Sequence, residues 1–342
     1  MNNIINIENV YRDFKVLKQR KGLKGSLVNL FCREYETINA VSGLNLHIQK
    51  GEIVGFIGTN GAGKSTTIKM MIGVLKQTSG NIEINGMNPY EDHTLFAKDI
   101  GVVFGQRTQL WWALPVRESF NILKQIYEVS NQDFIENMEF YEEIVGINKL
   151  LDKPARELSL GQRTLCDILA AFLHNPSIVF LDEPTIGLDV SMKYKIHTLI
   201  KELNQKKKTT VVLTTHDMSD VSELCNRIII MNKGNCIYDD SMDKLVKFFG
   251  NYKKVSLRFT ELSNADIYKK ISTSLTKNSG VQIEVVENGI ELLADEKKIT
   301  IMEVLNLIQQ SMNIQDVNVT DISIEEIVRK IYESDIGYDK KN

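Results

Sequence analysis

The chain has 342 residues, 43% of them hydrophobic and 25% charged, and its formal net charge is −3. This length exceeds one ordinary domain, so we expect a core domain with an appended one. The balanced charge gives no reason to expect a nucleic-acid partner, and no apolar run approaches the roughly 18 residues that span a bilayer. The four cysteines show no CxxC spacing, which is typical of reduced thiols in a cytosolic protein.

A glycine-rich segment follows an early apolar run. Ile53–Ile57 predicts a short buried strand, and Thr66–Lys76 predicts a helix with one apolar face. The residues from the strand end onward fit Gly-x-x-x-x-Gly-Lys-Ser and comprise Gly58, Thr59, Asn60, Gly61, Ala62, Gly63, Lys64, Ser65 and Thr66. In such a loop the backbone N–H groups face a phosphate, Lys64 meets the β- and γ-phosphates, and Ser65 ligates Mg²⁺. The pattern therefore predicts a site for a nucleoside triphosphate and Mg²⁺.

Two acidic residues end a second apolar run. Ile178–Leu181 is unbroken, as expected of a central parallel strand. Asp182 and Glu183 follow it at the edge where ligands bind in α/β sheets. Asp182 would hold Mg²⁺ directly or through water, and Glu183 would polarise the water that attacks the γ-phosphate. Taken alone, the pair is also compatible with acidic residues that merely end a strand.

Two more runs deliver polar side chains to the same edge. Val211–Thr215 precedes His216 and Asp217, and Ile100–Phe104 leads to Gln106. A lone histidine at a strand end is more often structural, but the position of His216 after the next strand favours contact with the γ-phosphate. The Gln106 amide would sense the metal and the water.

Leu158–Gln162, with the sequence Leu-Ser-Leu-Gly-Gln, precedes a predicted helix that runs from Gln162 through Leu173. All these motifs together resemble the nucleotide-binding subunit of ATP-binding cassette (ABC) transporters, over about Ile4 to Leu245. The resemblance implies an α/β P-loop NTPase cassette, in which a mixed core sheet has helices on both faces. A helical subdomain with the signature, over 107–165, and an antiparallel subdomain complete it. The implied roles are the Walker A loop for Gly58–Thr66, the Q-loop glutamine for Gln106, the signature for Leu158–Gln162, the Walker B strand for Ile178–Asp182, the catalytic glutamate for Glu183, the D-loop aspartate for Asp189 and the switch histidine for His216.

The signature implies a shared site. In this family two subunits pair head to tail, and the signature of one closes over the ATP held by the other. Ser159 and Gly161 begin a helix, so their N–H groups suit an anion, and Gln162 follows them. Ser159 as an ordinary helix cap is compatible with this role. Leu160 departs from the commonest signature, which has glycine there, and we expect its side chain to pack at the subunit interface.

An aromatic ring near the first strand would stack on adenine. The family usually supplies it shortly after that strand, where this chain offers Tyr11 and Phe14. Phe14 fits the spacing better than Tyr11, and Tyr35 is an alternative. Phe14 is equally compatible with a place in the core.

Residues 15–35 form a basic insertion. Leu23, Leu27, Leu30 and Phe31 recur at the spacing of one helix face. A basic amphipathic helix suits an anionic membrane surface or a partner helix, and an extra helix docked on the cassette with a solvated rim is the alternative. The segment resembles insertions in the cassettes of type-2 exporters, including those that export polysaccharide.

The last hundred residues predict a second domain over 249–342. The pattern alternates strands (Val255–Phe259, Val281–Val286, Ile290–Ala294, Ile314–Val319) with helices (Ala265–Leu275, Ile299–Met312, Ile324–Tyr332). The βαββαβ order suggests a small α+β ferredoxin-like domain. It resembles the C-terminal domain of drug-exporter cassettes, for which the implied role is dimerisation or regulation, and no polar cluster in the sequence argues for a ligand sensor.

The string Gln106–Trp112 contains adjacent tryptophans near the expected docking groove for a membrane partner, although two core aromatics are nearly as compatible. With the insertion and the tail, it resembles type-2 exporter ATPases of the drug or viologen type. We therefore expect an ATP-hydrolysing, Mg²⁺-dependent subunit that pairs with itself or a second cassette. It would drive a separate membrane permease from the cytoplasmic face of the membrane. A polysaccharide-type exporter or an importer cassette is the alternative, followed by a soluble cassette ATPase acting on ribosomes or DNA.

Overall fold

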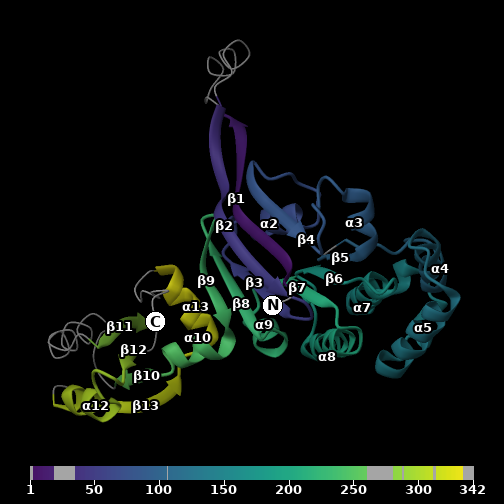
Figure 1. Ribbon diagram of the computed structural model, residues 1–342. Coiled ribbons are helices and arrows are strands. Elements are labelled where there is room, and N and C mark those ends of the chain that lie inside the picture. Colours follow the sequence, from purple (N-terminus) through teal and green to yellow (C-terminus); the bar gives the residue numbers. More distant parts are fainter. Residues whose placement is uncertain are drawn as a thin grey trace, which may run out of the picture. The chain divides into compact units, whose positions relative to one another are not determined.

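The computed structural model describes residues 3–18, 35–105, 107–259, 280–286, 289–310 and 313–333. The chain divides into two compact units, Met1–Ser241 and Met242–Asn342 (Figure 1). The boundary that we expected between 248 and 249 thus lies at the start of helix α10 (Met242–Phe249), whose contacts assign it to the second unit. None of the helices that the structure describes is long and apolar enough to cross a membrane.

A six-stranded sheet forms the centre of the first unit. Its strand order is β5-β6-β7-β3-β8-β9, and every neighbouring pair is parallel except β8 and β9. The strands are β3 (Ile53–Gly58), β5 (Ile100–Phe104), β6 (Ile178–Asp182), β7 (Thr210–Thr214), β8 (Arg227–Asn232) and β9 (Asn235–Ser241). All residues of β3 and β7 are buried, as expected of strands covered on both faces. Because these strands are parallel, their carboxyl ends meet at one edge.

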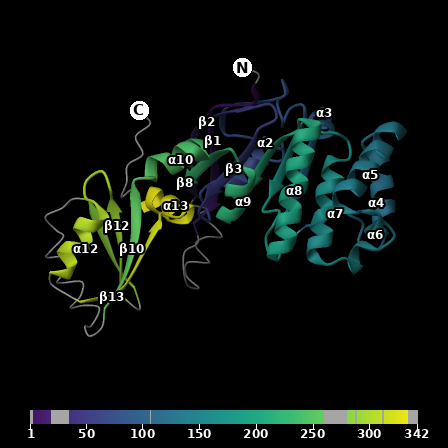
Figure 2. The same cartoon turned by 90° about the horizontal axis from the view of Figure 1, so that it is seen from below.

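The helices of the first unit include the expected helical subdomain. They are α2 (Lys64–Met71), α3 (His93–Asp99), α4 (Val116–Ile126), α5 (Asn131–Val145), α6 (Asn148–Leu151), α7 (Leu160–Phe172), α8 (Val190–Lys207) and α9 (Met218–Leu224), with a 3₁₀ turn at Ala155–Glu157. In Figure 2, α7 lies between α8 and the pair α4 and α5, and its contacts with α4 and α8 agree. α2 and α9 both contact β3, and α7 contacts β5.

Helix α2 is shorter than the sequence indicates. The apolar spacing predicts a helix through Lys76, but α2 ends at Met71. Gly73 follows with a positive φ of 75°, and a Cβ there would lie 2.1 Å from the carbonyl oxygen of Pro89. A contact from a distant segment therefore turns the chain where the local pattern would continue the helix.

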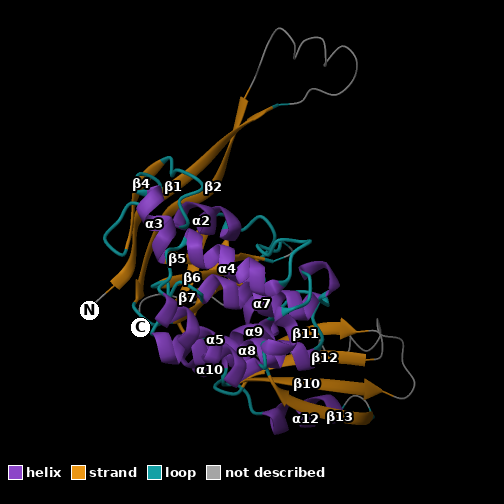
Figure 3. Cartoon of the chain, turned by 90° about the vertical axis from the view of Figure 1, so that its right-hand side faces the viewer, coloured by secondary structure: helices purple, strands orange, loops and turns teal. Residues whose placement is uncertain are grey.

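A second sheet in the first unit is antiparallel, in the order β2-β1-β4. It consists of β1 (Asn3–Leu17), β2 (Tyr35–Gln49) and β4 (Ser79–Ile84), and its apolar residues share one core with α2 and one face of the six-stranded sheet. β4 pairs with β1 only as far as Tyr11, whereas β2 pairs with it to Leu17. The outer halves of β1 and β2 thus form a two-stranded ribbon (Figure 3).

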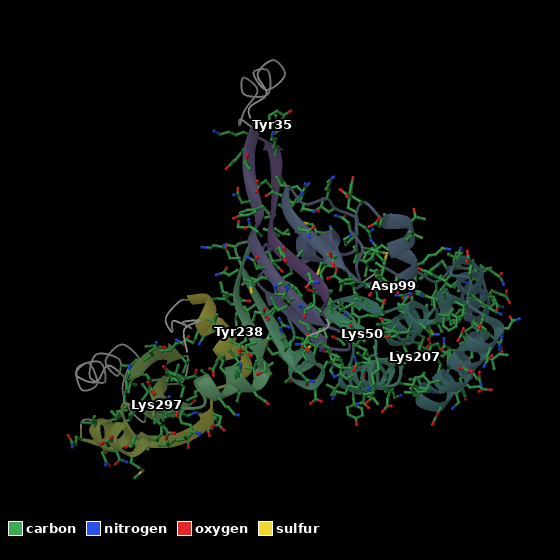
Figure 4. The ribbon with its side chains drawn as sticks, viewed as in Figure 1. Tyr35, Lys50, Asp99, Lys207, Tyr238 and Lys297 are labelled. Atoms are coloured by element: carbon green, nitrogen blue, oxygen red, sulfur yellow. The ribbon has the colours of Figure 1, made fainter. Side chains whose placement is uncertain are left out.

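The ribbon contains both ends of the basic insertion. Residues 15–17 are the last residues of β1, and Tyr35, the first residue of β2, is 54% exposed (Figure 4). The predicted amphipathic helix over Leu23–Phe31 lies outside the described residues.

The second unit has the expected ferredoxin-like strand order. It comprises α10, β10 (Tyr252–Phe259), β11 (Val281–Val286), β12 (Gly289–Asp295), α12 (Ile301–Gln309), β13 (Ile314–Asp321) and α13 (Ile324–Glu333). The sheet order is β11-β12-β10-β13 with every neighbouring pair antiparallel. One sheet face and α12 enclose a small apolar core. The predicted helix Ala265–Leu275 lies outside the described residues.

Candidate functional site

The glycine-rich loop connects β3 to α2 at the carboxyl edge of the sheet. Gly63 precedes α2 with a φ of 104°, a conformation that side-chain-bearing residues rarely adopt. A Cβ on Gly63 would lie 2.6 Å from the carbonyl oxygen of Ala40, so the loop is held against β2. Thr59, Asn60, Gly61 and Ser65 are exposed, while Gly58, Ala62 and Gly63 are buried and Thr66 is half-buried.

Lys64 lies in a half-buried position inside this loop. Its ammonium group donates to the carbonyl oxygens of Gly58 and Thr59, the latter at 3.2 Å. Burial lowers the pKa of Lys64, and the nearby carboxylates of Glu183 and Asp182 partly offset this effect. The structure thus brings the loop cation together with Asp182, the last residue of β6, and Glu183, which follows it.

Glu183 adopts an unusual backbone conformation beside the loop. Its φ is 49°, and its N–H donates to the carbonyl oxygen of Thr214 at 3.0 Å. Such left-handed geometry is costly for a residue with a side chain and occurs preferentially at functional sites. The Glu183 Oε1 atom lies 3.1 Å from His216 Nδ1, so the ends of β6 and β7 present two side chains that contact each other.

Thr214 fixes the other acidic residue. Its hydroxyl donates to Asp182 Oδ1 at 2.5 Å. The sequence identified this threonine only as part of a strand, because the hydroxyl becomes relevant only when β6 and β7 are neighbours.

Gln106 lies outside the described residues, but both of its neighbours are placed at the same edge. Gly105 N–H donates to the Asp182 carbonyl oxygen at 2.7 Å, and Arg107 N–H donates to that of Phe104 at 2.8 Å.

A buried carboxylate on α7 holds the segment that follows Gln106. Asp167 is 5% exposed, and its Oδ1 accepts from the Thr108 hydroxyl at 2.9 Å and from Gln109 N–H at 3.0 Å. Burial raises the pKa of Asp167 to about 6, against the opposing effect of these hydrogen bonds and Arg163. Sequence reasoning missed this residue, although a single charge within the apolar face of the predicted helix was a usable signal.

The three adenine candidates occupy different environments. Phe14 is half-buried, with the Arg12 guanidinium 4.5 Å from its ring centre. Tyr11 directs its hydroxyl to Gly43, where a Cβ would lie 3.0 Å away. Tyr35 is exposed on the outer part of the ribbon.

The signature forms the start of α7. Ser159 Oγ accepts from Gln162 N–H at 3.3 Å, and the Gln162 side chain accepts from Ser159 N–H at 3.1 Å, which is a complete capping box. Gly161 is buried, and a Cβ on it would lie 2.5 Å from Met192 Cγ. Asp189 caps α8 by accepting from Met192 N–H at 2.9 Å.

The Leu160 side chain is 39% exposed, and part of it lies near Gly187 of the same chain. A Cβ on Gly187 would be 3.4 Å from Leu160 Cδ2. Gly161 thus lies against α8 and Leu160 near the segment before α8, whereas Lys64, Asp182, Glu183 and His216 gather at the sheet edge.

Comparison with known proteins identifies the family to which this chain belongs. The model of the family described as ABC transporter matches residues 41–186. The chain is 32% identical over 266 residues to the energy-coupling factor transporter ATP-binding protein EcfA2 of Caldanaerobacter subterraneus subsp. tengcongensis, covering 76% of this chain and 87% of that one. It is 29% identical over 284 residues to the bacitracin transport ATP-binding protein BcrA of Bacillus licheniformis, covering 79% and 90%.

Solved structures agree. The dimeric post-hydrolysis structure of the ATP-binding cassette MJ0796, bound to ADP and Pi, is 26% identical with a TM-score of 0.56, covering 70% of this chain and 98% of that one. CbiO1 from Clostridium perfringens, at 23% identity, shares the fold with a TM-score of 0.59, covering 81% and 97%. The sheet, loop and signature together define an ATP-binding cassette. The chain belongs to the ABC transporter ATP-binding protein family, and it is an ATPase.

Proposed function

We propose that this chain is the ATP-hydrolysing subunit of an exporter, acting as a dimer on a separate membrane permease. The observation that carries the proposal is the contact between Glu183 and His216, 3.1 Å apart beside Lys64. A carboxylate, an imidazole and a cation in one place supply what hydrolysis of the phosphoanhydride bond between the β- and γ-phosphates requires, namely a base, an orienting group and charge neutralisation.

The glycine-rich loop would bind the phosphates of ATP, and Asp182 with Ser65 would bind Mg²⁺. The N–H groups of Gly58–Thr66 and the Lys64 ammonium would hold the β- and γ-phosphates. Asp182 and Ser65 would hold Mg²⁺, and they fit it because both offer the oxygen ligands that this ion prefers. Thr214 occupies one Asp182 oxygen as a donor and so fixes the carboxylate in one orientation. When bound, the ion would neutralise charge on the phosphates.

Hydrolysis would then depend on Glu183. Its carboxylate would accept a proton from water as the water oxygen bonds to the γ-phosphorus and ADP departs. His216, with Gln106, would orient that carboxylate and the γ-phosphate. Phe14 would stack on the adenine with one face, while Arg12 lies over the ring and the Tyr11 hydroxyl is turned to Gly43.

A second copy would complete each site. Ser159 Oγ accepts from Gln162 N–H, so its own proton is left to donate to a phosphate on the facing subunit. Gly161, Gln162 and Asp189 would line the same contact. The dimeric state of the MJ0796 cassette supports this arrangement.

The permease would dock near the segment after Gln106. Trp111 is 37% exposed and Trp112 is 54% exposed, with Arg163 stacked 5.3 Å from the Trp112 ring centre. A cavity of about 190 Å³, lined in part by Val74, Phe104 and Gln109, lies in the same region. Docking there would place the chain on the cytoplasmic face of a membrane.

The proposal that transport runs outward rests on observations other than those that support hydrolysis. It is supported by the ferredoxin-like second unit, which resembles that of drug-exporter cassettes, and by similarity to a bacitracin transport protein. Similarity to an energy-coupling factor protein keeps import as the second candidate.

The decisive experiment replaces Glu183 by Gln. ATP should still bind and hold the dimer closed, while steady-state turnover falls by about 10²–10⁴, the usual contribution of a general base. The control is Glu223→Gln, which alters a carboxylate on α9 that pairs with Lys201 at 3.7 Å, and it should leave turnover unchanged. Normal turnover in Glu183→Gln would remove Glu183 from the mechanism. Purification of the native protein from membranes with ribosomes or nucleic acid, and without a hydrophobic partner chain, would overturn the transport role.

A further inference from the structure

A fully buried carboxylate lies behind the two residues that face the γ-phosphate in the proposed site. Asp220 is on α9, and its side chain is inaccessible to solvent. Its Oδ2 accepts from the Thr185 hydroxyl at 2.5 Å and from the Thr215 hydroxyl at 2.7 Å. Its Oδ1 lies 2.8 Å from His197 Nε2 on α8. One carboxyl group therefore joins four separate segments of the first unit.

Each partner of Asp220 belongs to a segment that carries a proposed site residue. Thr185 comes two residues after Glu183, and Thr215 comes directly before His216. His197 lies on α8, the helix that Asp189 caps. The hydrogen bonds thus connect the end of β6, the end of β7 and α8 through a single group.

The strained backbone at Glu183 needs such an anchor. A residue with a φ of 49° persists only where its surroundings over-determine its conformation. On its amino side the Glu183 N–H is bonded to Thr214. On its carboxyl side the Thr185 hydroxyl bonds to Asp220, so the loop is fixed both before and after the strained residue.

The electrostatics favour a charged anchor. Burial by itself would raise the pKa of Asp220, but the hydrogen bonds from His197, Thr185 and Thr215 hold it below its ordinary value. A buried carboxylate with donors on both oxygens is rigid, because a move in any direction leaves a charged oxygen unpaired. Asp217, at the start of the same helix, pairs with Lys193 and adds a second link between α8 and α9.

We propose that Asp220 is a positioning residue for ATP hydrolysis, which sets Glu183 and His216 at their mutual distance through Thr185 and Thr215. The proposal rests on the proposed roles of Glu183 and His216. In this proposal the Thr185 and Thr215 hydroxyls affect the rate of ATP hydrolysis through their hydrogen bonds to Asp220, although neither hydroxyl contacts the nucleotide in the proposed mechanism.

The test uses Thr185, because an Asp220 variant would leave several buried donors unpaired and could prevent folding. Thr185→Val keeps the shape and removes the hydroxyl, whereas Thr185→Ser keeps the hydroxyl and removes a buried methyl group. In the purified full-length chain, we expect Thr185→Val to lower kcat for ATP about tenfold, with KM within about twofold, as one lost hydrogen bond to a charged group predicts. Thr185→Ser should retain kcat even where its melting temperature falls as much as that of Thr185→Val.

A matched control lies at the opposite end of β7. Thr209 is 1% exposed and its hydroxyl donates to the Pro176 carbonyl oxygen at 3.0 Å. Thr209→Val removes a buried hydroxyl hydrogen bond far along the strand from His216, so it should lower the melting temperature and leave kcat unchanged.

The outcomes separate this proposal from the proposed function. Normal kcat in Thr185→Val, or equal losses of kcat in Thr185→Val and Thr185→Ser that follow the melting temperature, would overturn the positioning role. A rise in KM alone would also overturn it. If Glu183→Gln turns over normally, the proposed function fails. If Glu183→Gln is inactive while Thr185→Val is normal, the positioning role fails and the proposed function stands.

Discussion

Two helix starts in the first unit are built in opposite ways. α2 begins after Gly63, which has no side chain and a φ of 104°. α7 begins with Ser159, whose side chain and that of Gln162 bond to each other's backbone N–H groups. Both helix starts match segments that contact phosphate in ABC cassettes. The start of α2 has no side-chain cap, because Gly63 has no side chain, whereas the start of α7 has a complete capping box.

From this difference we infer which of the two helix starts would bind ATP in a single chain. The first N–H groups of a helix have no partner within the helix, and a phosphate is a natural acceptor for them when the N-cap is glycine. At α7 the N–H of Gln162 is already satisfied, so the helix start is stable without a nucleotide. Of the two side chains in this capping box, Ser159 still has its hydroxyl proton to donate. We infer that α2 supports binding in the single chain, whereas α7 contributes when a second copy faces it.

The largest effect is expected when a side chain is added at Gly63, the residue before α2. Gly63→Ala places a Cβ 2.6 Å from the Ala40 carbonyl oxygen and forces alanine into a left-handed conformation. The loop must then move, and loss of two hydrogen bonds to charged phosphate, about 1.5–3 kcal/mol each, lowers ATP affinity at least about a hundredfold. Equilibrium binding of a fluorescent ATP analogue measures this change.

The control for that variant is Gly146→Ala. Gly146 follows α5 with a φ of 65°, and a Cβ on it would have no atom within 4 Å. It should cost about 1–2 kcal/mol of stability from backbone strain alone and leave ATP affinity unchanged. Equal affinity loss in both variants would mean that strain, rather than the loop contact, explains the effect.

At the start of α7, a substitution of Ser159 can separate its role as a helix cap from its proposed contact with a phosphate. Aspartate caps helices about as well as serine, so Ser159→Asp should change the free energy of unfolding by less than about 0.5 kcal/mol. Its negative charge would repel the phosphate on the facing subunit, so we expect turnover to fall at least about tenfold with ATP affinity of the single chain unchanged. Ser159→Ala should instead lose about 1 kcal/mol of stability.

Denaturant unfolding and steady-state phosphate release measure the two effects for each Ser159 variant. If Ser159→Asp keeps normal turnover, the start of α7 is a structural cap only, and the comparison between the two helix starts loses its functional meaning.

The parts of this molecule that the sequence predicts are those whose chemistry is local. The loop at 58–66 and the polar residues at the ends of β6 and β7 follow from contiguous patterns, because parallel strands place their carboxyl ends at one edge of the sheet. The early end of α2 was not predictable, since it depends on the Pro89 carbonyl oxygen meeting Gly73. Asp220 and Asp167 act through partners 5 to 59 residues away, and no local pattern encodes those pairs.

The second unit also contains contacts between distant residues that no local sequence pattern predicts. No polar cluster is apparent from its sequence, yet Lys254 pairs with Glu291 at 2.8 Å and with Glu326 at 2.7 Å. These groups line a cavity of about 250 Å³ that also includes Gln282. They come from β10, β12 and α13, so only the strand order brings them together.

The smallest expected effect concerns the reason for glycine within the signature. A Cβ on Gly161 would lie 2.5 Å from Met192 Cγ, so the space is closed by α8 of the same chain. Gly161→Ala should therefore shift α7 against α8 at a cost of about 1–3 kcal/mol, the usual cost of overpacking. We expect a several-fold loss of turnover, with little change in ATP affinity at the loop of the single chain.

Met192→Ala provides the second half of this test, because it removes the methionine side chain that the new methyl group meets. We expect the double variant Gly161→Ala/Met192→Ala to recover most of the turnover, and Met192→Ala alone to lose stability but not turnover. If the double variant stays as slow as Gly161→Ala, the constraint on Gly161 lies outside its own chain, at a nucleotide bound by the facing copy. That result would make the backbone of α7, and not only the Ser159 hydroxyl, part of the shared site.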